Sequence, residues 1–567
     1  MNGTASSRRD LALLLLAGCV LIGAGLGLRD PWPADEPLHA LIARTMLATG
    51  NWLIPMVGGD FFQDKPPLLF WLQAICFRLT GSERTGFLLP SLLAALGTLA
   101  LVYDLGRRLW NREAGWHAAW LLLFTAQFML QARRGQLDAL LVFCTVLSIY
   151  CLLRQLLSGG GWWWAVGAGI AAGLGTLTKV VGFLSFLVLL PWLYAVWRGW
   201  PGVKWQRPLA MWGVSLVAWG AVVGAWLLPI WLRARHDPAV ADYLHELVVT
   251  QTFDRYVAPW HHFKPVWYYL QVMATLWLPA VVLLPWLVPR WRAALRTRDA
   301  RVLLPLVFVV LYLGFFTLSS GKRDLYILSA LPMFTLVAGP WLPALLHKRS
   351  VQRVLAGLLV LIAWACFGAA LWLQVLRPEQ GRTLLAAGGV SSFAPLHVLG
   401  WCAVVAFSLW WYERCKAQHA LAATIAAGWL IVGWWVFPQM DGQRSARDFV
   451  ARLEQQAAPD RPLGLLAYHE NFLWQLTRPT VNFGHRRFRE GDQEVFDAAA
   501  WLVAGSDRQL LVPEEMLRPC FSGAGSVVDL GEGSGGRWYL VQGRPAADCI
   551  ARGDAGRALD YSPAGNR

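Results

Sequence analysis

Apolar runs of about 20 residues follow one another along most of this chain, and they limit the folds that are open to it. A run of this length lets a helix cross the hydrocarbon core of a bilayer while satisfying its own backbone hydrogen bonds. The sequence therefore predicts an all-α polytopic membrane protein with thirteen transmembrane helices. The runs cover residues 11–28, 86–105, 114–131, 137–153, 162–178, 180–198, 209–232, 266–289, 302–318, 324–345, 354–375, 393–412 and 419–437.

The composition of the 567 residues excludes the other broad classes of protein. Hydrophobic residues make up 56% of the chain, charged residues make up 15%, and there are 34 Trp. A soluble chain of this length would form several domains, and this composition cannot supply the polar surface that they need. The high hydrophobic content also excludes a disordered chain, which would need few apolar and many charged residues. The net charge of +15 comes mostly from Arg at the ends of the runs, which indicates membrane orientation rather than nucleic-acid binding.

The positions of the basic residues predict the orientation of the helices. Arg and Lys cluster in alternate short loops, as the bias toward cytoplasmic positive charge requires. The first run has the composition of a signal peptide, but Arg29-Asp30-Pro31 replaces the small residues of a cleavage site, so we interpret it as the first helix. Since the N-terminus is then cytoplasmic and the number of helices odd, the C-terminus lies outside.

The composition changes sharply after Phe437, where an ordinary soluble segment with helical and strand-like stretches begins. We therefore predict a transmembrane domain over residues 1–437 and a small soluble α/β domain over residues 438–567, outside the cytoplasmic membrane. Cys520 and Cys549 are the only cysteines of this second domain. In an oxidising periplasm they could form a disulfide, but the sequence leaves the paired and the free forms open.

Two long external loops, residues 29–85 and 233–264, carry charged residues beside Trp and Pro. In the first loop, apolar residues on one helical face predict an interfacial helix that starts at Asp35 and stops at Gly50. A second apolar helix, from Leu68 to Leu79, follows the segment Asp64-Lys65-Pro66-Pro67. Two interpretations of Asp35 stay open, a side-chain cap of the helix or a functional carboxylate, and Lys65 could also extend its ammonium group to the membrane interface.

Lysine is rare in this chain, and three lysines lie beside predicted external helix ends: Lys65, Lys179 and Lys322. Carboxylates and further cations accompany them on the same side of the membrane, in Asp138, Asp254-Arg255-Tyr256 and Lys322-Arg323-Asp324-Leu325-Tyr326. If the bundle folds back, these groups reach one cavity. Cations that hold phosphate, beside a carboxylate that orients or deprotonates an acceptor, suit a lipid-linked anionic substrate.

These segments resemble a known family. The first loop, from Ala34-Asp35-Glu36-Pro37 to Asp64-Lys65-Pro66-Pro67, is similar to that of the bacterial lipid A aminoarabinose transferases. With the protein O-mannosyltransferases, these belong to the GT-C class of integral-membrane glycosyltransferases. The resemblance continues in order through most of the membrane region, at Leu137-Asp138, Leu177-Thr178-Lys179, Asp254-Arg255-Tyr256 and Ser320-Gly321-Lys322-Arg323-Asp324-Leu325-Tyr326. It implies thirteen transmembrane helices, interfacial helices and a periplasmic C-terminal domain.

The resemblance also implies a function and a set of site residues. The family moves a sugar from a polyprenyl-phosphate carrier to an acceptor at the periplasmic face of the bacterial inner membrane, with a glycolipid of the lipid A type, another glycan or a protein as the acceptor. Attack opposite the leaving group would invert the anomeric centre. The implied catalytic residues are Asp35 and Asp138, the implied ligands of the carrier phosphate are Lys65, Arg255, Lys322 and Tyr326, and the implied supporting residues are Glu36, Asp64 and Lys179.

The chain departs from the family in ways that bear on metal and acceptor. Some members hold a divalent cation with a Glu at the position of Asp64 and a His of the second large loop, where this chain has Val249-Thr250-Gln251-Thr252. A shorter carboxylate without an imidazole disfavours a metal site, so the metal stays unknown and no cofactor is assigned. Leu38-His39 replaces the Arg-Tyr of many members, which leaves the acceptor open.

Two other classes of function are compatible with many helices and charged cavities. A flippase or transporter for lipid-linked sugars would usually show two related halves and helices that break near the middle of the membrane. Here the polar residues are concentrated outside and the sequence has no internal repeat, which favours the transferase. A scaffold function would rest only on the C-terminal domain, in which the sequence shows no catalytic signature.

Overall fold

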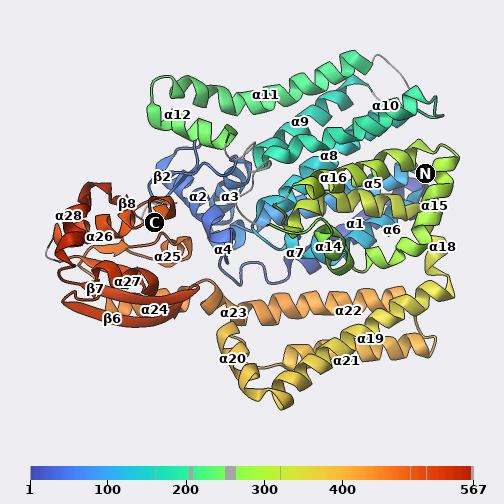
Figure 1. Cartoon of the computed structure of the whole chain (residues 1–567). Helices are drawn as coiled ribbons and strands as arrows, with labels where there is room; N and C mark the ends of the chain where they lie inside the picture. Colours follow the sequence, from blue (N-terminus) through green and yellow to red (C-terminus); the bar gives the residue numbers. More distant parts are fainter. Residues whose placement is uncertain are drawn as a thin grey trace.

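The computed structural model describes residues 2–159, 161–203, 208–249, 263–319, 321–485, 487–505 and 507–562. It consists of a bundle of helices and a C-terminal domain built on a six-stranded sheet (Figure 1). The N-terminus lies at the end of the bundle that is remote from the sheet, and α2 and α3 of the first long loop lie at the opposite end, beside the sheet (Figure 1). The first loop and the C-terminal domain therefore share one side of the molecule, and the location of that side in the periplasm stays a prediction.

Among the described residues, nine helices are long and apolar enough to cross a membrane, or ten if a pair bent by 99° forms one span. The bent pair is α14 (Tyr268–Leu276) with η3 (Ala280–Leu283) and α15 (Leu284–Arg296). The nine are α4 (Glu83–Gly86) with α5 (Leu89–Leu109), α8 (Leu137–Ser158), η1 (Val180–Val188) with α10 (Leu189–Trp197), α11 (Pro208–Ala234), α16 (Ala300–Leu318), η4 (Asp324–Ala330) with α17 (Leu331–Ala338), η5 (Gly339–Trp341) and α18 (Leu342–Leu346), α19 (Arg349–Leu371) with η6 (Trp372–Leu376), α21 (Ala394–Trp411), and α22 (Ala417–Ile431) with η7 (Val432–Val436), α23 (Phe437–Arg444) and α24 (Arg447–Gln456).

The three remaining predicted runs are also helical, but each has a feature that shortens its apolar length. The helix α1 (Asn2–Gly23) contains three consecutive charged residues, 8–10, and α9 (Trp162–Thr178) has 17 residues. The third run is divided into α6 (Arg112–Leu123) and α7 (Ala126–Ala132). All thirteen predicted runs are thus helical, and the crossing of the membrane by all thirteen stays a prediction.

Two glycines end the helices of the first loop where the sequence predicts. The helix α2 (Glu36–Thr49) is followed by Gly50, and α3 (Leu68–Thr80) by Gly81, both in the left-handed conformation with φ of 70° and 63°. Only glycine reaches this conformation without a steric cost, so each glycine stops its helix sharply. A short hairpin of β1 (Met56–Val57) and β2 (Asp60–Phe61) connects the two helices. The second long loop begins with α12 (Pro238–His245).

The C-terminal domain has the predicted α/β character. Its strand order is β6-β7-β5-β3-β4-β8, in which β3 pairs in parallel with β4 and β5, while the remaining pairs are antiparallel. Cys520 and Cys549 form a disulfide, with Cα atoms 5.8 Å apart. The division after Phe437 stays a prediction. The strands are β3 (Leu463–Leu465), β4 (Thr480–Asn482), β5 (Gln509–Pro513), β6 (Ser526–Gly533), β7 (Gly536–Gln542) and β8 (Leu559–Tyr561). The helices are α25 (Glu470–Gln475), α26 (Gln493–Val503), α27 (Glu514–Cys520) and α28 (Ala547–Arg552), with η8 (Arg487–Glu490) and η9 (Ala555–Arg557). In the bundle, α20 (Pro378–Gly388) follows η6.

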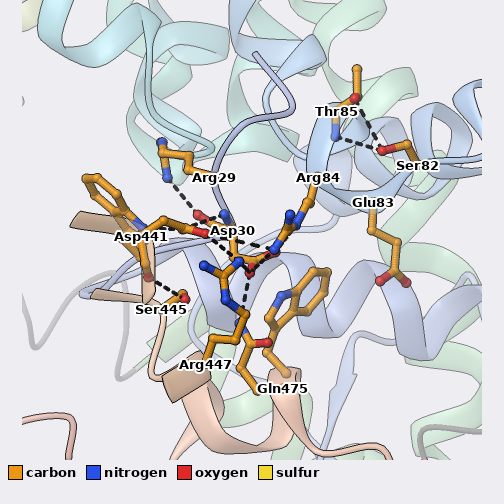
Figure 2. A network of polar contacts seen from close by, with 12 residues as sticks. Arg29, Asp30, Ser82, Glu83, Arg84, Thr85, Asp441, Ser445, Arg447 and Gln475 are labelled. Atoms are coloured by element: carbon orange, nitrogen blue, oxygen red, sulfur yellow. Dashed lines mark hydrogen bonds and ion pairs between the residues drawn. The ribbon is translucent and has the colours of Figure 1, made fainter. Parts of the chain in front are cut away.

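A cluster of ion pairs, which we call the clamp, joins the C-terminal segment to the first loop (Figure 2). It consists of Asp30, Arg84, Asp441, Arg447 and Gln475. Asp30 accepts two hydrogen bonds from the Arg84 guanidinium, at 2.6 and 2.7 Å, and one from Gln475 at 3.2 Å. Asp441 accepts from the backbone N–H of Asp30 at 2.8 Å, and its other carboxylate oxygen lies 3.0 Å from Arg447. The clamp thus fixes the start of the first loop against α23, α24 and α25.

Candidate functional site

Asp35 lies directly before α2, but its side chain makes no capping hydrogen bond to that helix in the described part of the chain. The interpretation of Asp35 as a side-chain cap is therefore wrong. Its Oδ2 lies 3.4 Å from Nε2 of Gln136 and 3.4 Å from Nη2 of Arg323. The carboxylate thus points away from its own helix, toward the segment before α8 and the segment before η4.

Asp138, Lys179 and Tyr326 form a second contact group. Asp138 is buried in the first turn of α8, and its Oδ1 accepts a hydrogen bond of 3.2 Å from Nζ of Lys179. Lys179 follows the last residue of α9, and its Nζ lies 4.7 Å from the ring centroid of Tyr326. Three elements that are distant in sequence therefore meet at one ammonium group.

The electrostatics link these two groups. Burial raises the pKa of Asp35, but His39, Arg323 and Lys65 outweigh it and hold the pKa of this carboxyl below its ordinary value. Burial lowers the pKa of Arg323, and Asp35 and Asp138 together raise it above its ordinary value. The structure therefore brings Asp35, Lys65, Asp138, Lys179 and Tyr326, all predicted from the sequence, into one neighbourhood.

Lys322 has a different environment. Its side chain is buried, and its Nζ donates to the backbone carbonyls of Ser319 and Lys264. Burial lowers the pKa of this ammonium group. The predicted contact of Lys322 with a carrier phosphate stays a prediction, while the observed contacts of the ammonium group are with the chain itself.

Glu36 is a buried structural carboxylate. It forms an ion pair with Arg29 through two hydrogen bonds of 2.5 and 2.8 Å, and both side chains are 4% exposed. It also accepts from the backbone N–H groups of Trp32 and Gly135, at 2.9 and 2.8 Å. Glu36 thereby holds the start of α2, which Asp35 precedes, against the segment that leads into α8, and its supporting role at the site stays a prediction.

Asp64 and Arg255 are the two remaining site residues that the sequence predicts. Asp64 lies next to Lys65, partly exposed, between β2 and α3. Arg255 lies outside the described residues. Within the described ranges, no group of three His, Cys, Asp or Glu side chains is arranged to hold a metal ion.

Sequence reasoning did not select four residues that lie at the site: His39, Gln136, Arg323 and Glu470. His39 is buried, with Nδ1 3.3 Å from the carbonyl oxygen of Gly135, and burial lowers its pKa. Glu470 begins α25 of the C-terminal domain, and burial together with the charge of Asp35 raises its pKa. Arg323 and Gln136 stand beside recognised motif residues, which is a weak signal, whereas no sequence pattern marks Glu470.

The chemical capacity of this arrangement follows from its charges. Lys65, Lys179 and Arg323 can hold a phosphate ester in a partly desolvated place. Asp35 is ionised at neutral pH, because its pKa lies below the ordinary value, so it can accept a proton or orient a hydroxyl group. A cationic side and an anionic side, close together, are what a group transfer from a phosphate ester to a nucleophile requires.

Comparisons of the sequence agree with this chemistry. Residues 64–227 match the family model described as dolichyl-phosphate-mannose-protein mannosyltransferase. The chain is 29% identical to the undecaprenyl phosphate-alpha-4-amino-4-deoxy-L-arabinose arabinosyl transferase of Pseudomonas aeruginosa. The aligned 442 residues cover 75% of each chain. It is 32% identical over 376 residues to arabinosyl transferase 1 of Pseudomonas fluorescens Pf-5, covering 64% of this chain and 66% of that one.

Comparisons of the fold extend over more of the chain. The structure of ArnT from Cupriavidus metallidurans bound to undecaprenyl phosphate superposes with a TM-score of 0.73 at 19% identity, covering 95% of this chain and 98% of that one. The oligosaccharyltransferase AglB from Archaeoglobus fulgidus superposes with a TM-score of 0.52 at 12% identity, covering 91% of this chain and 70% of that one. The fold of the present chain, including its C-terminal domain, is thus similar to that of ArnT.

Proposed function

We propose that the chain is an integral-membrane glycosyltransferase of the GT-C class, which moves a sugar from a polyprenyl-phosphate carrier to an acceptor at the periplasmic face of the inner membrane. The observation that carries this proposal is the contact of Asp35 with Arg323, in the neighbourhood of Lys65 and Asp138. The similarity to named transferases favours this enzyme over a flippase for lipid-linked sugars.

The proposed reaction breaks the bond between the anomeric carbon of the sugar and the phosphate oxygen, and the electron pair stays on that oxygen. The leaving phosphate thereby gains a negative charge, which Lys65, Arg323 and Lys179 stabilise more in the transition state than in the ground state. An acceptor oxygen forms the new bond to the anomeric carbon from the opposite face, which inverts this centre. If the acceptor is a hydroxyl group, its proton passes to Asp35, whereas an ionised phosphate needs only positioning.

The sugar and the acceptor are the finer parts of the proposal. The name of the Pseudomonas aeruginosa relative gives 4-amino-4-deoxy-L-arabinose on undecaprenyl phosphate, which makes this donor the first candidate. A glycolipid of the lipid A type is the first candidate acceptor, and a glycan or a protein is the alternative. The replacement of the family's Arg-Tyr by Leu38-His39, with His39 buried near Asp35, is the feature of this chain that bears on the choice.

Mass spectrometry of envelope lipids, glycans and proteins tests the proposed function directly. We expect cells without this gene to lose one sugar adduct that returns when the gene is restored, and the adduct mass identifies both the sugar and the acceptor. Loss of the adduct together with accumulation of the carrier-linked sugar on the cytoplasmic face would instead identify a flippase, and an unchanged set of adducts would contradict the proposed function.

Replacing Gln136 by Met tests how the ionised form of Asp35 is maintained. The amide of Gln136 donates to Oδ2 of Asp35, and a donor to the ionised form lowers the pKa of a carboxyl. Transfer that needs the carboxylate is present above the pKa of Asp35 and is lost as the pH falls through it. We expect Gln136→Met to raise this pKa, so the acid limb of the profile of kcat/KM against pH moves to higher pH.

Gln131→Met is the matched control for this measurement. Gln131 is an equally buried amide in α7, with 3% exposure against 4% for Gln136. We expect the Gln131 variant to keep the pH profile of the unmodified enzyme. An acid limb that stays in place in the Gln136 variant, or that moves equally in both variants, would contradict the role of Gln136 as a positioning residue.

A further inference from the structure

The segment between α16 and η4 carries two adjacent cations, Lys322 and Arg323, in unequal environments. The side chain of Lys322 is buried, and two backbone carbonyls accept hydrogen bonds from its ammonium group. The side chain of Arg323 is 29% exposed, and its guanidinium meets Asp35. Of these two cations, the guanidinium is therefore the one that a ligand can reach.

The contact between Arg323 and Asp35 is loose by the standard of this chain. It is a single contact of 3.4 Å between Nη2 and Oδ2, and the carboxylate side chain is 33% exposed. The ion pair of Arg29 with Glu36, by contrast, has two hydrogen bonds of 2.5 and 2.8 Å and is buried on both sides. A monodentate, partly exposed pair contributes little free energy, so little opposes its replacement by a stronger partner.

A phosphate ester is such a partner for a guanidinium group. The planar fork of Arg matches two phosphate oxygens at once, which a single contact with Asp35 does not use. The carrier phosphate has one negative charge in the donor and gains a second as the bond to the sugar breaks. The hold of Arg323 on the phosphate therefore strengthens during the reaction, as catalysis by differential binding requires.

We propose that Arg323 is a phosphate-binding residue of the carrier site, and that the carrier phosphate draws its guanidinium away from Asp35. This inference rests on the proposed function. Before donor binds, Arg323 neutralises the carboxylate of Asp35. Once the phosphate engages Arg323, Asp35 keeps its contact with Gln136, and its carboxylate is available to the acceptor. Donor binding therefore releases the carboxylate of Asp35 from Arg323. As a result, the donor binds first and the acceptor second.

A double-mutant cycle on binding of undecaprenyl phosphate tests the exchange. The full-length protein in lipid nanodiscs is compared as the unmodified enzyme, Arg323→Gln, Asp35→Asn and the double variant. We expect Arg323→Gln to weaken binding by about tenfold or more, as for a charge-assisted contact. We expect Asp35→Asn to tighten binding about three- to tenfold with Arg323 present and less than about twofold with Gln at 323, because the competing pair is then absent.

The controls separate the exchange from a general effect of charge. Glu379→Gln and Arg382→Gln remove the charges of an exposed pair on α20 and are expected to leave binding unchanged. Arg323→Lys, which keeps the charge without the fork, is expected to retain part of the affinity. Tightening by Asp35→Asn that is equal in both backgrounds overturns the exchange, and so does unaltered binding by Arg323→Gln. If the unmodified protein does not bind undecaprenyl phosphate at all, the proposed donor class itself fails.

Discussion

Replacing Asp35 by Asn is expected to reduce sugar transfer by about 10²- to 10⁴-fold, the range that general base catalysis contributes. Asn has nearly the same shape, but it carries no charge and accepts a proton poorly. The fold should be kept, because within the described residues the side chain of Asp35 caps no helix and its ion pair is partly exposed. The measurement is turnover of a defined donor by purified protein, alongside the yield of folded, membrane-inserted protein.

Asp237→Asn is the matched control for this substitution. Asp237 also stands before a helix with proline at its start, but it does cap that helix, by accepting a hydrogen bond of 3.1 Å from the backbone N–H of Ala239. Because Asn caps about as well as Asp, we expect the Asp237 variant to keep both its fold and its activity. Near-normal turnover by Asp35→Asn would remove Asp35 from the proposed mechanism.

Replacing Glu36 by Ala is expected to lower the free energy of unfolding by about 3–5 kcal/mol, the usual cost of breaking a buried ion pair from one side. The guanidinium of Arg29 would stay buried without its partner, and the backbone N–H groups of Trp32 and Gly135 would lose their acceptor. The measurement is the unfolding temperature of the purified protein in nanodiscs, together with the fraction that stays monodisperse.

The control for Glu36→Ala uses another glutamate in the first turn of a helix with an arginine partner. Glu379 and Arg382 form an exposed pair at 3.0 Å, and such a pair contributes about 0–1 kcal/mol. We expect Glu379→Ala to change the unfolding temperature little. The double variant Arg29→Met with Glu36→Leu should recover part of the loss, since no charge is then left buried. If Glu36→Ala and Glu379→Ala shift the unfolding temperature equally little, the buried pair does not stabilise the fold as proposed.

The parts of the fold that the sequence predicted are those that depend on local properties of the chain. An apolar run of sufficient length forms a helix wherever it lies, and a glycine such as Gly50 or Gly81 stops a helix whatever surrounds it. The predicted α/β character of the C-terminal segment follows from the same local patterns. The sequence does not decide the pairing of Cys520 with Cys549, since the pairing depends on a distance between residues that spacing alone does not give.

The site was predictable in its residue types but not in its contacts. The partners of Asp35 lie 101 residues away at Gln136 and 288 residues away at Arg323, and no local pattern specifies either. The same limit explains why the sequence leaves a side-chain cap open as one interpretation of Asp35, since capping is a usual role of Asp before a helix. Lys322 and Arg323 are neighbours in sequence, and only the fold shows that one is enclosed by carbonyls while the other faces a carboxylate.

The clamp connects the beginning and the end of the helix bundle, so the C-terminal segment is held at two places and not only by the peptide chain. Asp30 comes just after the first helix and Asp441 just after the last run of membrane helices, so their contact joins the two ends of the bundle. A polypeptide shortened after Phe437 would lose Asp441, Arg447 and Gln475 together. If the C-terminal segment is replaced by that of a relative, the new segment must therefore supply a carboxylate and an arginine that match Asp30 and Arg84. The C-terminal segment and the first loop are thus expected to change together in evolution.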